Sequence, residues 1–175
     1  SVEDEVRKIK RRLEEALERS EKKVRDMVRR NKEFLERAKR RVEEVVKENE
    51  RALEEVKRRG NGEKELEDLH RKNREDKERE RKDARKLHED NRDEHRKHEE
   101  ELRKLRRDLE RKEKDADIDE EILRRVRKTV KDVEDTLKEL NDRLEKIHRE
   151  VKKELDRLLK ELDDRHRKVA EDLKK

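Results

Sequence analysis

The chain has 175 residues, of which 65% are charged, 25% hydrophobic and 1% aromatic, and its formal net charge at pH 7 is +5. It has no cysteine, which excludes disulfides and thiolate metal sites, and no proline, so Gly60 and Gly62 are its only strong helix breakers. No apolar run approaches the roughly 18 residues of a membrane span, and no signal-peptide segment opens the chain. We therefore expect a soluble protein whose cellular location the sequence does not specify.

The first predicted element is a helix over about residues 2–59, which repeats itself every 18 residues. The blocks 6–23, 24–41 and 42–59 match position for position, aligning for example Val6/Val24/Val42, Leu17/Leu35/Leu53 and Leu13/Asn31/Asn49. Eighteen residues are five turns at 3.6 residues per turn, so each position returns to the same face without drift. The repeat predicts a straight amphipathic helix, and Ser1 followed by Asp4 has the spacing of an N-cap.

The second predicted element runs from about residue 63 to 114 and is far more polar. Gly60 is suited to the left-handed position that closes the first helix, and 60–62 form a tight turn. Neither 71–83 nor 89–101 contains an aliphatic or aromatic residue. The 18-residue period nevertheless persists and aligns Leu66/Ala84/Leu102, Leu69/Leu87/Leu105 and Asn73/Asn91/Leu109.

The third predicted element is a helix over about residues 118–174, preceded by a second turn at 115–117. Asp117 followed by Glu120 has the spacing of an N-cap and its capping-box partner. Here too the apolar positions recur every 18 residues, as in Ile122/Leu140/Leu158 and Val133/Val151/Val169. The fold class predicted is all-α: one domain over residues 1–175, a straight antiparallel three-helix bundle of long helices.

Suppose that both turns fold the helices back so that their ends lie level. Residue i of the first helix then faces a residue near 122−i of the second helix, and residue j of the second helix faces a residue near 232−j of the third. This mapping predicts a layer of Asn31, Asn91 and Asn141, a layer of Leu13, Leu109 and Leu123, and Asn49 facing Asn73 opposite Leu159. It also places His70 near Leu162, His88 near Leu144, and His95 near Leu137. Buried asparagines that bond one another penalise any slip in register, since a displaced amide loses its partner.

The candidate site is therefore a set of inward polar side chains with a structural role. Its members are Asn31, Asn91, Asn141, Asn49, Asn73, His70, His88, His95, His98, His148 and His166. If the histidines are buried and neutral, their pKa falls below the ordinary value, and stability should be lost as the pH drops below about 6.5.

The chain resembles de novo designed, parametrically generated helical bundles, most closely those with buried hydrogen-bond networks. The resemblance rests on three near-equal helices, 18-residue blocks, capping signals, matched asparagines, and the absence of Trp, Tyr, Cys and Pro. The thin apolar stripe of residues 63–114 departs from that pattern. The resemblance implies no natural substrate, cofactor or partner.

Metal binding is the most specific chemistry to weigh. His95 and His98 are spaced i,i+3, and Glu67/His70 and Glu145/His148 have the Glu-x-x-His spacing of di-metal bundles. The mapping separates the two Glu-x-x-His motifs by about 20 Å along the bundle, and a structural zinc site needs about four ligands at one level. We therefore predict no metal site and no cofactor.

Other functions find less support. Basic clusters such as 37–41 are interleaved with acids, and there is no aromatic platform for bases, so we expect no specific nucleic-acid binding. No catalytic constellation or Gly-rich phosphate loop is present, so we predict no enzyme. The prediction is a scaffold that needs no partner and is monomeric. The alternatives are a homo-oligomer or helix-binding module that uses the seam between the first and third helices, and a spectrin-like or single-helix spacer.

Overall fold

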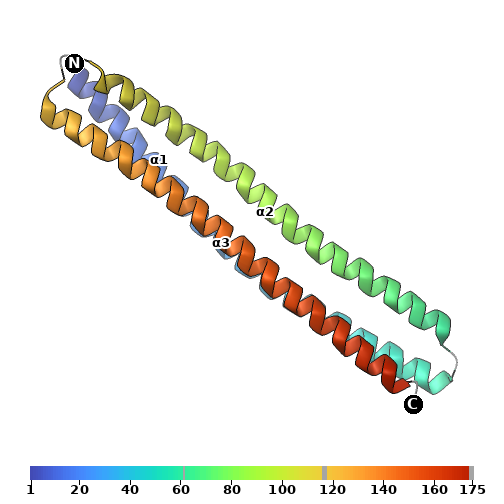
Figure 1. Ribbon diagram of the computed structural model, residues 1–175. Helices are drawn as coiled ribbons and strands as arrows, with labels where there is room; N and C mark the ends of the chain where they lie inside the picture. The colour runs from blue at the N-terminus through green and yellow to red at the C-terminus, as the bar shows by residue number, and fades with distance from the viewer. Residues whose placement is uncertain (61, 116–117, 174–175) are drawn as a thin grey trace. The chain divides into compact units, whose positions relative to one another are not determined.

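The structure is a computed structural model that describes residues 1–60, 62–115 and 118–173. It contains three long α-helices, α1 (Val2–Arg59), α2 (Glu63–Glu113) and α3 (Glu120–Leu173), and the described residues include no strand (Figure 1). The predicted class, an all-α three-helix bundle, is confirmed. The bounds of α1 are as predicted, whereas α2 ends one residue early and α3 begins two residues late.

The ends of α1 follow from local chemistry. The backbone N–H of Asp4 donates to Ser1 Oγ at 3.3 Å, which satisfies one of the free amides of the first turn. At the other end, Gly60 has a φ of 72°, and its N–H donates to the carbonyl of Val56 at 3.1 Å. Only glycine adopts that backbone region at little cost, so Gly60 ends the helix as predicted.

The start of α3 differs from the prediction. Asp117, the predicted N-cap, lies outside the described residues, and α3 begins at Glu120. The carbonyl of Asp119 accepts the N–H of Leu123 at 3.0 Å, which is the first bond of the helix. Asp119 therefore occupies the capping position, where its carboxylate faces the positive end of the helix dipole.

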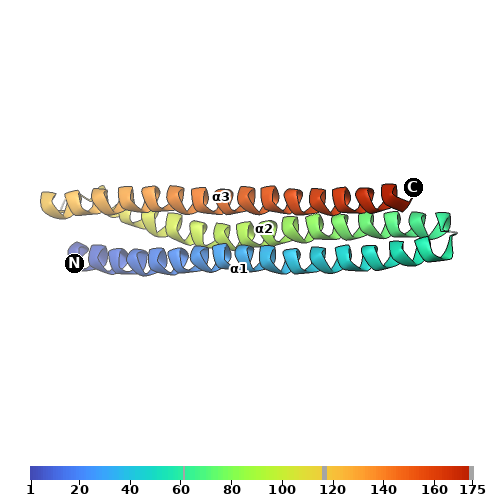
Figure 2. The ribbon, with the colours of Figure 1, turned by 90° about the horizontal axis from the view of Figure 1, so that it is seen from below.

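The chain forms two compact units, each built from segments of all three helices. Unit 1 comprises Ser1–Arg29 and Glu89–Ile147, and unit 2 comprises Arg30–His88 and His148–Lys175. Within each unit α2 runs antiparallel to its neighbours (Figure 2). In unit 1, Arg19–Glu101 joins α1 to α2, and Arg106–Glu134 and Arg127–Glu113 join α2 to α3. In unit 2, Arg41–Glu80 joins α1 to α2, and His70–His166 and His88–His148 join α2 to α3.

The core of unit 1 is mostly apolar, although Ser20, Asn91, His95 and Thr129 are also buried. Leu13 of α1 and Leu102 and Leu109 of α2 are all 0% exposed, and they pack in one cluster with α3. The predicted partner on α3, Leu123, is only half-buried, whereas Val126 is 1% exposed. The α3 member of the predicted leucine layer is thus wrong. The reason is that α3 packs against α2 in a different register from the 232−j mapping assumed in the sequence analysis.

In the core of unit 2, α1 and α3 supply mostly apolar side chains, together with Asn31, Asn49 and His166, whereas α2 supplies polar ones. α1 contributes buried Val42, Val46 and Leu53, and α3 contributes buried Leu155, Leu159 and Leu162. The buried side chains that α2 adds to this unit are Asn73 and Glu80, while its Leu66, Leu69, Ala84 and Leu87 are half-buried. Because its inward positions are polar, α2 must be held here largely by hydrogen bonds and ion pairs.

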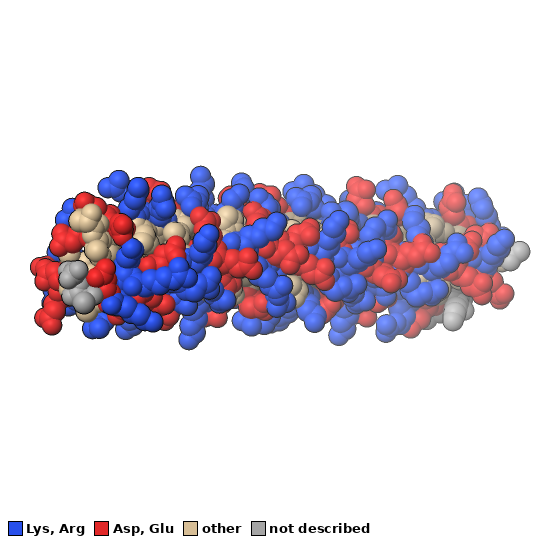
Figure 3. All heavy atoms as spheres, turned by 90° about the horizontal axis from the view of Figure 1, so that it is seen from above, with Lys and Arg blue, Asp and Glu red and all other residues tan. Residues whose placement is uncertain are grey.

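The surface carries charges of both signs. Figure 3 shows Lys and Arg interspersed with Asp and Glu over the visible face of the helices. No large hydrophobic side chain among the described residues is exposed. None of the described helices has a segment apolar enough to cross a bilayer.

Candidate functional site

The best-defined polar contact inside the protein joins α1 and α2 in unit 2. Asn49 Nδ2 donates to Asn73 Oδ1 at 3.0 Å, and both residues are 4% exposed. The predicted pairing of these two asparagines is confirmed. The α1–α2 register read from the sequence is therefore correct at this level, and Leu159 of α3 is buried in the same unit, at 1% exposed.

The predicted layer of three asparagines spans both units and stays a prediction. Asn31 is buried at the start of the unit 2 segment of α1, while Asn91 is buried and Asn141 half-buried in unit 1. Within unit 1, Asn141 of α3 lies close enough to His95 of α2 to influence the pKa of that histidine. Asn91 Nδ2 is buried and has no hydrogen-bond partner among the described residues. Asn141 thus has a histidine partner that the mapping did not foresee.

Two histidine pairs link α2 and α3 in unit 2. His166 Nε2 lies 3.0 Å from His70 Nδ1, with the ring centres 4.5 Å apart and the rings at 84°. The rings of His88 and His148 are stacked, with centres 3.6 Å apart and planes at 14°. In both pairs, the α3 partner lies four residues, about one helical turn, beyond the residue that the sequence mapping predicted.

One register shift explains these contacts together. The sequence mapping placed His70 at Leu162, His88 at Leu144 and His95 at Leu137. The observed partners are His166, His148 and Asn141, each four residues further along α3. A shift of one turn keeps the apolar face of α3 inward, because its leucines recur every three or four residues. The α2–α3 register predicted from the sequence is therefore wrong by one turn.

The histidines differ in burial. His95 and His166 are 3% and 7% exposed, while His88, His98 and His148 are half-buried. His70 is exposed, contrary to its predicted inward position, because its ring packs against the edge of His166 and its remaining surface faces solvent. Burial lowers the pKa of His95 and of His166 below the ordinary value, since a buried imidazolium loses its hydration.

An ion pair that the sequence did not reveal joins α1 and α2. Arg41 Nε and Nη2 donate to Glu80 Oε1 and Oε2 at 2.6 and 2.9 Å, and the side chain of Glu80 is 9% exposed. The guanidinium also lies 5.6 Å from the ring centre of Phe34. The hydrogen bond to Glu80 raises the pKa of Arg41. This two-pronged pairing fixes the relative height of the two helices.

The 18-residue period held a signal for these polar contacts. Glu80 occupies the repeat position of His98, and Lys77 occupies that of His95. Lys77 Nζ donates to Asp163 at 2.8 Å, and its side chain is only 18% exposed. The burial of Glu80 and Lys77 could thus have been inferred from the repeat, because their positions carry inward histidines 18 residues later.

We expect acidification to destabilise unit 1 through His95. Its folded pKa lies below the unfolded value of 6.5, so its contribution is fully present above pH 6.5 and is lost as the pH falls through 6.5 toward the folded pKa. Glu99 of α2 and Asn141 of α3 oppose the shift, while His98 adds to it. The measurement is the urea midpoint of unfolding at pH 7.5 and at pH 5.

Two variants separate His95 from the other titrating groups. His95→Leu should flatten part of the pH dependence. His98→Gln should leave most of it, because His98 has the smallest influence on the pKa of His95. A parent midpoint that does not fall between pH 7.5 and 5 would contradict this prediction.

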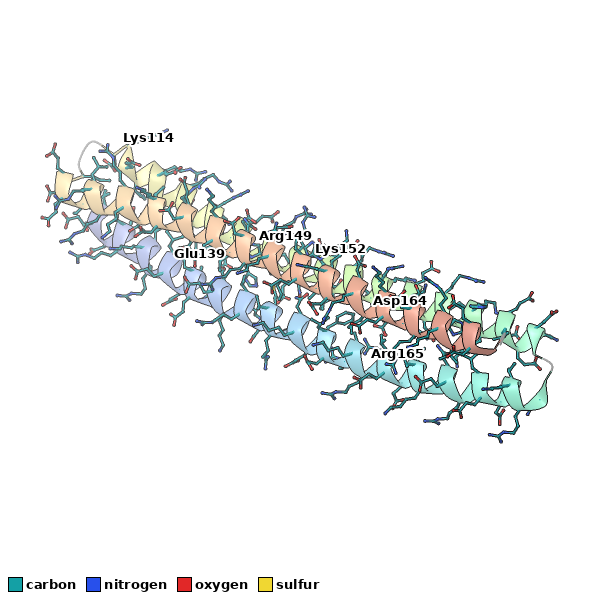
Figure 4. The ribbon with its side chains drawn as sticks, turned by 60° about the horizontal axis from the view of Figure 1, so that its bottom comes forward. Lys114, Glu139, Arg149, Lys152, Asp164 and Arg165 are labelled. Atoms are coloured by element: carbon teal, nitrogen blue, oxygen red, sulfur yellow. The ribbon has the colours of Figure 1, made fainter. Side chains whose placement is uncertain are left out.

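Many other charged side chains lie on the surface, although those of Asp76, Glu99 and Arg106 are largely buried. Figure 4 labels Glu139, Arg149, Lys152 and Asp164 on the outer side of α3, all exposed, and Arg165 reaches Glu50 of α1 at 3.0 Å. Within the described part of the chain, no group of three or more His, Asp or Glu side chains is arranged to hold a metal ion. Comparison with protein-family models, with curated proteins and with solved structures gives no match.

Proposed function

We propose that the protein is a de novo designed structural scaffold with no natural biochemical function, whose buried polar side chains specify how its helices align. The observation that carries this proposal is the hydrogen bond between Asn49 and Asn73. Each of these asparagines recurs 18 residues away in its own helix, at Asn31 and Asn91. A matched polar pair at equivalent positions of two repeating helices penalises displacement of one helix along the other.

The repeat contains its own apolar counterpart of this pair. Leu13 and Leu109 occupy the repeat positions of Asn49 and Asn73, and both are 0% exposed. An apolar pair at this position therefore packs well and stabilises the core, but it does not distinguish one register from the next. The asparagines supply that distinction at the cost of some burial energy.

The polar character of α2 in unit 2 supports the same role. Its links to α1 and α3 include Glu80 with Arg41, Lys77 with Asp163 and His70 with His166. Each link requires a particular residue at a particular height, unlike contacts between leucines. The alternative role, association through the seam between α1 and α3, is not favoured, because no large hydrophobic among the described residues is exposed.

A thiol cross-linking reporter can test the role of the asparagines, since the chain has no cysteine of its own. The long side chains of Glu48 and Lys72 meet in an exposed ion pair of 3.5 Å, so Glu48→Cys/Lys72→Cys places two thiols at the same level, where a short bifunctional thiol reagent should join them in the native register. Glu48→Cys/Asp68→Cys places the second thiol one turn away. We expect only the first pair to cross-link in the parent, and both to cross-link once Asn49→Leu/Asn73→Leu is added.

Mass spectrometry after treatment with the thiol reagent measures both products. Cross-linking confined to residues 48 and 72 in the leucine background would show that the asparagines do not set the register. Light scattering on the parent distinguishes the scaffold from a self-associating module, because the proposal requires a monomer at working concentration.

A further inference from the structure

The pair formed by His70 and His166 has a geometry that a hydrogen bond alone does not require. Their facing nitrogens are 3.0 Å apart, and the ring centres are 4.5 Å apart. Two imidazoles joined head-on at this N···N distance would hold their centres further apart. The ring axis through at least one of the two nitrogens is therefore inclined to the line that joins them.

We propose that His70 Nδ1 and His166 Nε2 form a bidentate site for Cu²⁺ or Ni²⁺. A metal ion binds each imidazole nitrogen at about 2.0–2.1 Å, so two ligands at a right angle are roughly 2.9 Å apart. The observed separation of 3.0 Å is close to that value. Right-angled nitrogen ligands suit tetragonal Cu²⁺ and Ni²⁺ better than tetrahedral Zn²⁺.

Access to the site comes from the α2 side. His70 is exposed and borders an open hollow that is lined by Glu67, Asp68, His70, Arg71 and Arg74. Solvent molecules can therefore complete the coordination. Lys77 of α2 is paired with Asp163 of α3 at 2.8 Å, so the positive charge of this ammonium is offset by a carboxylate. With two protein ligands the ion should bind reversibly rather than as part of the fold.

The second histidine pair provides a matched control. His88 and His148 also join α2 to α3 in unit 2, but their rings are stacked at 14° with centres 3.6 Å apart. The lone pairs of an imidazole lie in the plane of the ring. The lone pairs of two stacked rings therefore lie in two nearly parallel planes and cannot converge on one ion.

The test is calorimetric titration of the whole chain with CuCl₂ and with NiCl₂ at pH 7.5 in a non-coordinating buffer. We expect one ion per chain, with zinc binding more weakly. His70→Gln should weaken binding by at least about tenfold, because one of two ligands is lost, and its exposed position spares the fold. His166→Gln should do the same, and circular dichroism verifies that it folds. His88→Gln should leave the affinity unchanged.

Electron paramagnetic resonance gives a readout independent of affinity. The Cu²⁺ spectrum of the parent should carry coupling to two imidazole nitrogens, and that of His70→Gln to one. The proposal is overturned if binding has no 1:1 saturation, if neither His70→Gln nor His166→Gln weakens it, or if His88→Gln removes it.

Discussion

We expect Asn49→Leu to lower the free energy of unfolding by about 1–3 kcal/mol, although it adds apolar volume to the core. The reason is the partner: Asn73 is 4% exposed and its Oδ1 accepts the bond from Asn49 Nδ2. With that donor gone, the amide of Asn73 remains buried without its hydrogen bond and without compensating water. Urea unfolding followed by circular dichroism measures the difference.

The double variant Asn49→Leu/Asn73→Leu should recover the lost stability, and it may be compared directly with the Leu13 and Leu109 pair of unit 1. Replacing both partners leaves no orphaned amide and copies an arrangement that the chain already uses. Leu159→Asn provides a contrasting variant, because it introduces an amide at a 1% exposed position of α3. If Asn49→Leu is neutral, or if the double variant is no more stable than the single, the hydrogen bond does not hold the two asparagines in place.

We expect Arg41→Leu to destabilise the protein by about 2 kcal/mol, because it leaves the carboxylate of Glu80 buried and unpaired. Removing one partner of a fully buried pair costs about 3–5 kcal/mol. The side chain of Arg41 is 43% exposed, so solvent screens part of that cost here. The two-pronged hydrogen bond and the contact with Phe34 make the loss larger than that of an ordinary surface pair.

The pair of Arg165 and Glu50 is the matched control. It also joins two helices in unit 2, but its side chains are 56% and 45% exposed. Arg165→Leu should therefore cost less than about 1 kcal/mol. Raising the salt concentration should weaken the Arg165 pair more than the Arg41 pair, because exposed charges are screened more strongly. Equal losses in the two variants would show that the burial of Glu80 has no energetic consequence.

The contacts between α1 and α2 could be predicted from the sequence because they follow from a short turn. Gly60 closes α1 and α2 begins at Glu63, so the short turn keeps the ends of the two helices nearly level, and the asparagines then select among registers one turn apart. Asn49 and Asn73 then fall at the same height. The prediction needed only the helical repeat and the position of the glycines.

The contacts between α2 and α3 could not be predicted in the same way. The connection from Glu113 to Glu120 is longer than assumed, and it carries no glycine to mark its end. The leucines of α3 permit either of two registers one turn apart, since both bury the same face. The pairs His70–His166 and His88–His148 show which of the two registers α3 adopts, and they become visible only in the tertiary structure.

The sequence by itself determined where the helices lie, how they end and which face of each turns inward, because helix geometry and capping act over a few neighbouring residues. Only the tertiary structure decided which charged side chains are buried, and which residues of α3 the histidines of α2 meet. Glu80 has the composition of a surface residue, and its burial is tolerable because Arg41 approaches from another helix. Partners of this kind are far apart in the chain, so their pairing depends on the packing of whole helices rather than on any local pattern.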